Sequence, residues 1–152
     1  EGQVDEIARE ALRPFEAGSE NPYAVQQDLQ ECMHNLVGII RTEDELDKAL
    51  EELTALQERA RRVTVEGHRQ YNPGWHLALD LRSMLTVSEC ITRAARERRE
   101  SRGAQTRDDY PGTDPELAKV NVVVRERDGA LSLALEALPV MPDYLNELLE
   151  DG

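Results

Sequence analysis

Charged side chains crowd one short stretch of the sequence, RRESRGAQTRDDYP at residues 98–111. It contains four arginines, three acids and one glycine, and it ends in proline. A guanidinium is a planar fork that pairs bidentately with carboxylates, so this stretch could hold a carboxylate or carbonyl in a fixed geometry. Three roles are open at this point: a solvated helix end with internal salt bridges, a nucleic-acid patch, and a docking element.

The charge of the whole chain argues against a general nucleic-acid binder. The 152 residues include 31 acids against 18 lysines and arginines, which gives a formal net charge of -13 at pH 7. Nucleic-acid affinity depends on neutralising phosphates. We therefore expect no nucleic-acid partner.

The remaining reactive side chains show no pattern that predicts catalysis. His34, His68 and His76 lack metal-ligand spacing, and no cysteine pairs with them. Cys32 and Cys90 each fall on an apolar helical face, which indicates reduced thiols in the core. The nine glycines are too scattered to form a phosphate-binding loop. We predict no catalytic residue, no metal ligand and no cofactor in this chain.

Three long segments that repeat apolar residues at spacings of three and four must position the charged stretch. Asn-Pro pairs at 21–22 and 72–73 predict helix starts, and TEDE at 42–45 predicts a capping box. The second helix is expected over about 43–65 and the third over about 75–101. We expect the core between the helices to contain Leu46, Leu50, Leu53, Leu56, Leu77, Leu81, Leu85 and Ile91. Short links predict an antiparallel three-helix bundle of the spectrin-repeat kind.

A β-hairpin is expected after the charged stretch. Valines alternate at 120, 122 and 124, leucines alternate at 131, 133 and 135, and Asp128-Gly129 between them is a strong turn signal. A short helix is expected after Pro142 and another over the opening residues. The predicted fold is mainly α, with a C-terminal β-hairpin and short terminal helices.

The domain organisation follows from these elements. We expect a lead-in helix and linker over 1–21, a three-helix bundle ending in the charged turn over 22–111, and a β-hairpin with a C-terminal tail over 112–152. No apolar run approaches the roughly 20 residues that span a bilayer. The chain opens inside an amphipathic pattern without an initiator Met, so we expect it to be a piece of a longer protein.

The charged stretch resembles a motif that flavoprotein subunits of the succinate dehydrogenase/fumarate reductase family carry late in the chain, R-x-E-S-R-G-A-H-x-R-x-D-(F/Y)-P. The positions that match are Arg98, Glu100, Ser101, Arg102, Gly103, Ala104, Arg107, Asp109, Tyr110 and Pro111. Gln105 stands where the family usually has His, and GTDPE replaces the arginine-aspartate run that often follows. The expected helices, the expected hairpin and the segment LPVMP at 138–142 that follows it also resemble the family. The resemblance therefore covers roughly residues 22–142.

The resemblance implies a C-terminal helical domain of an FAD-dependent flavoprotein that interconverts succinate and fumarate. It implies FAD in the parent protein, and it makes 1–21 the lead-in from the FAD-binding domain. The implied partners are the FAD-binding and capping domains and an iron–sulfur subunit. The implied location is cytoplasmic, at the cytoplasmic face of the membrane and without insertion. The family's catalytic and flavin-attachment residues lie upstream, so this chain alone is expected to be inactive.

Within that implied architecture we interpret the charged turn as an interdomain docking element formed by Arg102, Gly103, Arg107 and Asp109. Gly103 is expected to end the third helix in the left-handed conformation. The two arginines are then expected to project outward and to contribute more to docking than to folding. Two alternatives stay open: the same domain of L-aspartate oxidase or adenylylsulfate reductase, and an independent acidic helical interaction module.

Overall fold

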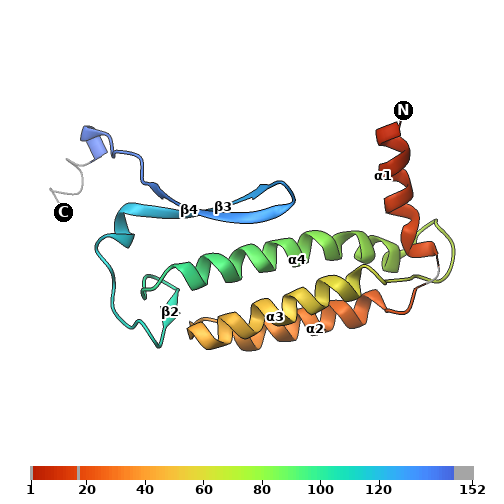
Figure 1. The fold of residues 1–152 in the computed structure, drawn as a ribbon, viewed down its shortest axis with the longest axis horizontal. Helices are drawn as coiled ribbons and strands as arrows, with labels where there is room; N and C mark the ends of the chain where they lie inside the picture. The colour runs from red at the N-terminus through yellow and green to blue at the C-terminus, as the bar shows by residue number, and fades with distance from the viewer. Residues whose placement is uncertain (1, 17, 146–152) are drawn as a thin grey trace.

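The computed structural model describes residues 2–16 and 18–145, and it is mainly helical with a small antiparallel hairpin, as the sequence predicts. Figure 1 shows three long helices side by side, with the hairpin alongside one of them. The longer helices are α1 (Gly2–Leu12), α2 (Pro22–Leu36), α3 (Glu43–Ala60) and α4 (Pro73–Glu97). The other elements are the 3-10 turns η1 (Arg13–Phe15) and η2 (Leu117–Lys119), and the strands β1 (Ile40–Arg41), β2 (Thr106–Arg107), β3 (Val120–Arg127) and β4 (Ala130–Ala137).

The core lies between α2, α3 and α4, which pack against one another in pairs. Its buried apolar side chains are Val25, Leu29, Cys32, Val37, Leu46, Ala49, Leu53, Leu56, Val63, Leu81, Leu85 and Ala95. Five of the eight predicted core residues are therefore confirmed, while Leu50 and Leu77 are only partly buried. The prediction for Ile91 is wrong, because it is 46% exposed. Smaller side chains of α4, Ser88 and Thr92, take the inward positions there.

Each long helix begins where the sequence predicts. The Asn21 Oδ1 atom accepts from the Tyr23 amide at 2.9 Å, and the Asn72 Oδ1 atom accepts from the Trp75 amide at 3.0 Å. Thr42 forms the predicted capping box at the start of α3. These side chains satisfy helix N–H groups that have no partner within the helix.

The predicted end of α3 is wrong, since the helix stops at Ala60 and not near Val65. The chain there becomes extended and pairs with the linker before α2, where the Thr64 amide donates to the Glu20 carbonyl at 3.0 Å. The linker comes so close that a Cβ on Gly18 would lie 2.5 Å from the Arg62 carbonyl oxygen. Backbone pairing to a distant segment therefore replaces the last helical turn.

The predicted end of α4 is also wrong, because the helix stops at Glu97 and not near Ser101. Gly103 is not the terminal residue of the helix. It has φ +60 within a two-residue turn, where Arg102 and Gln105 exchange backbone hydrogen bonds of 2.9 and 3.1 Å. Arg98 and Glu100, which lie between the helix and this turn, make side-chain contacts, described below, that a continued helix would break.

The hairpin prediction is confirmed. Asp128 and Gly129 have φ of +54 and +77, the left-handed pair that a tight two-residue hairpin turn requires. Strands β3 and β4 pair over eight positions each, with Val122 opposite Leu135 and Val124 opposite Leu133. Because opposite residues share a face, the alternating valines and leucines form one apolar face of the hairpin.

The opening segment is anchored to the start of α4. The Trp75 indole donates to the Ala11 carbonyl at 2.7 Å, and its ring lies 5.5 Å from that of Phe15. Helix α1 itself has no buried residue and leads away from the three long helices (Figure 1). At the other end of the chain, residues 143–145 are helical, and the rest of the helix expected after Pro142 lies outside the described residues. Among the described helices, none is long and apolar enough to cross a membrane.

Candidate functional site

The charged stretch folds back along the segment that precedes α3. Strand β2 pairs in parallel with β1, which sets Thr106 beside Ile40 and Arg107 beside Arg41. The Asp108 amide donates to the Arg41 carbonyl at 3.0 Å. This short parallel pair brings the stretch to the place where α4 ends and α3 begins.

Arg107 lies at the centre of the first charged cluster and is fully buried, with 0% exposure. Its Nη1 atom donates to the Ala95 carbonyl at 3.0 Å and to the Arg96 carbonyl at 3.2 Å. A cation here satisfies carbonyls at the end of α4 and complements the negative end of the helix dipole. Its Nε and Nη2 atoms form a bidentate pair with Asp109, at 2.8 and 2.7 Å, and its guanidinium lies 5.0 Å from the centre of the Tyr110 ring.

Asp109 connects this cluster to α3. Its Oδ2 atom also accepts from the Glu43 amide at 2.8 Å, in the first turn of that helix. The Arg107 guanidinium, and then the Glu43 amide, lower the pKa of Asp109 to about 2. Arg107 and Asp109, which we call the Arg107 clasp, therefore join the end of α4 to the start of α3.

A second cluster surrounds Glu100, whose carboxylate is also fully buried. Arg102 binds it bidentately, with Nε to Oε1 and Nη2 to Oε2 both at 3.0 Å. Oε2 also accepts from the Asp114 amide at 2.8 Å, and Oε1 accepts from Arg98. The hydrogen bonds from Arg102, followed by those from the Asp114 amide and Arg98, lower the pKa of Glu100 to about 2.

Arg98 extends this cluster to the hairpin. Its Nη1 atom donates to the Leu117 carbonyl at 3.1 Å, and its Nη2 atom donates to the Val120 carbonyl at 2.7 Å. We call Arg98, Glu100 and Arg102 the Glu100 clasp. It fixes the start of β3 to the end of α4.

Gln105 links the Glu100 clasp to strand β1. Its Nε2 atom donates to the Arg98 carbonyl at 3.0 Å, and its Oε1 atom accepts from Arg41 at 3.4 Å. The side chain at position 105 therefore needs one hydrogen-bond donor and one acceptor, and it needs no charge. An amide supplies both, so a histidine is not needed for these contacts.

The structure brings together all four residues predicted to dock, but it exposes them unequally. Gly103 lies at the open tip of its turn, and the Arg102 side chain is 40% exposed. Asp109 keeps part of its carboxylate accessible. The expectation that Arg107 projects outward is wrong, because four of its N–H groups bind within the chain. Docking by the exposed members stays a prediction.

Sequence reasoning missed the structural role of Glu100. An available signal was its spacing, because Glu100 has an arginine two residues away on either side. A carboxylate between two arginines can accept several charge-assisted hydrogen bonds once the chain leaves the helix. Its burial could not be foreseen, because it depends on residues 114–120 folding over it.

The cysteines and histidines add no second reactive site. Cys32 and Cys90 are free thiols, and Cys32 lies in the core as expected. The expectation that Cys90 also lies in the core is wrong, because it is only partly buried. Burial, followed by the charge of Glu52, raises the pKa of Cys32 to about 11. A thiol with that pKa is a poor nucleophile near neutral pH. Among the described residues there is no group of three or more His, Cys, Asp and Glu side chains that could hold a metal ion.

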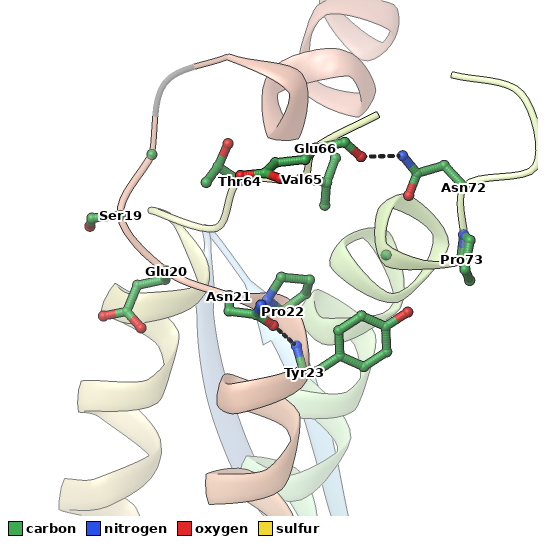
Figure 2. A pocket seen from close by; sticks show the side chains of 12 residues that line it. Ser19, Glu20, Asn21, Pro22, Tyr23, Thr64, Val65, Glu66, Asn72 and Pro73 are labelled. Carbon is green, nitrogen blue, oxygen red and sulfur yellow. Dashed lines mark hydrogen bonds between the residues drawn. The ribbon is translucent and has the colours of Figure 1, made fainter. Parts of the chain in front are cut away.

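A pocket of about 490 Å³ lies where α2 and α4 begin, and Figure 2 shows the side chains around it. Asn21 and Asn72 line it, but their oxygens already cap the two helices. The Asn72 amide also donates to the Glu66 carbonyl at 3.0 Å. Both asparagine side chains of this pocket are therefore used by the fold.

Comparisons with known proteins identify the family of the chain. A family profile described as "Fumarate reductase flavoprotein C-term" matches residues 26–145. A fumarate reductase flavoprotein subunit of Mycobacterium tuberculosis is 36% identical over 125 residues, which are 81% of this chain and 21% of that protein. An L-aspartate oxidase of Acinetobacter baylyi is 37% identical over 92 residues, 60% of this chain and 16% of that protein.

A solved structure matches nearly the whole chain. In Mycobacterium smegmatis Sdh1 in complex with UQ1, one chain superposes with a TM-score of 0.92 and 44% identity. The match covers 98% of this chain and 26% of that one. The chain thus spans about a fifth to a quarter of the length of these relatives.

Proposed function

This chain belongs to the family of fumarate reductase flavoprotein C-terminal domains, and we propose that it supports and docks onto the flavin-binding part of a succinate dehydrogenase or fumarate reductase flavoprotein. The parent reaction is the interconversion of succinate and fumarate, with electrons passed to an iron–sulfur subunit. The observation that carries this proposal is the match over 98% of the chain to the Mycobacterium smegmatis structure.

In this proposal α2, α3 and α4 act as an antiparallel three-helix bundle of the spectrin-repeat kind over residues 22–111. Residues 1–21 lead in from the FAD-binding domain, and 112–152 form the hairpin and tail. The pairwise packing of the three helices supports the bundle. The anchoring of Phe15 against Trp75 supports a lead-in whose direction is fixed.

The partners follow from the same assignment. The FAD-binding and capping domains contact this chain, and Arg102, Gly103 and Asp109 contribute to that contact through the exposed side of the charged turn. The iron–sulfur subunit belongs to the same complex, at the cytoplasmic face of the membrane. FAD is held by the parent protein, and this chain supplies neither a catalytic residue nor a flavin contact.

One alternative has an observation in its favour. The match to an L-aspartate oxidase shows that the same type of domain occurs in a protein of that name. That match is shorter than the match to the fumarate reductase subunit, 92 residues against 125, so the succinate/fumarate assignment is preferred.

The reading frame upstream of Glu1 tests the proposal at once. We expect it to continue into a glycine-rich FAD-binding domain followed by the substrate-binding residues of a succinate/fumarate enzyme. An upstream start codon that leaves no such domain would contradict the assignment and favour an independent acidic interaction module.

A further inference from the structure

The β3–β4 hairpin is held together more firmly than it is held to the helices. Its eight-position ladder is reinforced by an Arg125–Glu136 ion pair and by Ser132, whose hydroxyl donates to the Arg125 carbonyl at 3.1 Å. None of residues 120–137 is buried, although the hairpin lies against α4. Burial of apolar area is the main force that seats one element on another, so that force is weak here.

The surface of α4 under the hairpin is only half covered. A pocket of about 370 Å³ separates the two, with Ile91 and Ala94 of α4 on one side and Val122 of β3 on the other. Ile91 is 46% exposed, and Val87, one turn earlier on the same face, is 56% exposed. The hairpin therefore covers Ile91 and Ala94 without packing tightly onto them.

Polar contacts at one end of the hairpin supply the attachment that the apolar face lacks. Arg98 donates to the Leu117 and Val120 carbonyls, directly at the start of β3. Glu100 accepts from the Asp114 amide at 2.8 Å, and Arg102 donates to the Asp114 carbonyl at 3.0 Å. These are charge-assisted hydrogen bonds, which are stronger than neutral ones.

The turn at the opposite end is exposed, and the residue that follows β4 is hydrogen-bonded to the end of η2. Asp128 and Gly129 are exposed, and the Leu138 amide donates to the Lys119 carbonyl at 2.9 Å. The end of β4 thus returns to the anchored end of β3. The hairpin is attached at its base and extends along α4 from there (Figure 1).

We propose that the β3–β4 hairpin is a strap hinged at the Glu100 clasp, which holds it closed over α4 and lets it lift as one body. Opening the strap uncovers Ile91 and Ala94 of α4 while α2, α3 and α4 stay folded. The inference rests on this chain alone and stands whether or not the proposed function is correct.

Hydrogen exchange measured by mass spectrometry on the 152-residue chain tests the strap. Glu100→Gln replaces the carboxylate between Arg98 and Arg102 with a neutral amide. A two-stranded hairpin that has lifted off its support is only marginally stable, so its ladder opens more often. We therefore expect the amides of 120–137 to exchange together and roughly tenfold faster, while the slowest amides of α2 and α3 keep their rates. Glu97→Gln is the matched control, since Glu97 is an exposed carboxylate at the end of the same helix, and it should change neither region.

A second variant distinguishes local loosening of the hairpin from destabilisation of the whole fold. Arg98→Lys keeps the positive charge, but one ammonium group cannot reach the Leu117 and Val120 carbonyls as the guanidinium fork does. It should reproduce the selective acceleration in the hairpin. Unchanged hairpin exchange in both variants would overturn the proposal. Equal acceleration of hairpin and helices, or loss of helical circular dichroism, would also overturn it, because the clasp would then hold the whole fold.

Discussion

At the scale of single residues, the arginines of one motif differ in what they contact. Arg107 is buried against the end of α4, Arg102 is half exposed on a buried carboxylate, and Arg99 reaches only Glu43 at the surface. The spacing of residues in the sequence could identify the motif, but it could not tell which of these arginine side chains are buried. Their burial depends on β1 and on residues 114–120, which approach from distant parts of the chain.

Arg107→Ala should lower the free energy of unfolding of this chain by roughly 3–5 kcal/mol. The change removes the buried partner of the ion pair with Asp109 and leaves the Ala95 carbonyl without its donor. Denaturant titration followed by circular dichroism measures the change.

Arg99→Ala is the matched control, because that ion pair is exposed and should contribute less than about 1 kcal/mol. Equal effects of the two substitutions would show that the Arg107 clasp does not stabilise the fold.

The two buried or half-buried carboxylates predict an acid-sensitive fold. Glu100 and Asp109 both have pKa values of about 2 in the folded chain, below the ordinary values of about 4 in an unfolded one. Because the folded pKa values are lowered, their contribution to stability is complete above about pH 4.5 and is lost as the pH falls towards 2.

Melting temperatures measured from pH 6 to pH 2.5 test this dependence. The wild-type chain should lose stability more steeply than Glu100→Gln combined with Asp109→Asn, in which neither side chain titrates. Parallel curves for the two proteins would mean that other carboxylates govern the acid response.

At the scale of elements, the sequence predicted where helices start better than where they end. Asn21, Thr42 and Asn72 cap the helices with their own side chains, so the start signals are local. The ends of α3 and α4 depend on non-local partners, the linker before α2 and the two clasps. The hairpin was predictable because Asp128-Gly129 requires no partner beyond the turn itself.

Leu53→Ala should cost roughly 2–5 kcal/mol in the free energy of unfolding, because Leu53 is 1% exposed in the core of the three long helices. Ile91→Ala is the control on α4, and its half-exposed side chain should cost clearly less. Denaturant titration of both variants checks the comparison. A cost below about 0.5 kcal/mol for Leu53→Ala would remove it from the core.

At the scale of the whole molecule, the chain has the fold of a fumarate reductase flavoprotein C-terminal domain. Resemblance in the charged stretch was enough to predict the family, and the family match over 26–145 confirms it. The resemblance did not show that the motif also stabilises the fold from inside. The same turn therefore places Arg107 inward, where it stabilises the fold, and Gly103 at an open tip, where docking stays a prediction.

The purified chain should bind no FAD and oxidise no succinate, because its glycines form no phosphate-binding loop in the sequence. The visible spectrum of the purified protein and an assay with an artificial electron acceptor measure both properties. A yellow protein with stoichiometric flavin would contradict this expectation.

The most direct test of the central claim is the flavin content of a chimeric flavoprotein in which this chain replaces the matching C-terminal part of Mycobacterium smegmatis Sdh1. If the chain is the supporting domain of such a flavoprotein, the chimera should retain FAD and oxidise succinate, and a version lacking the domain should not. A chimera that folds, as judged by circular dichroism, but holds no more FAD than the version without the domain would contradict the account.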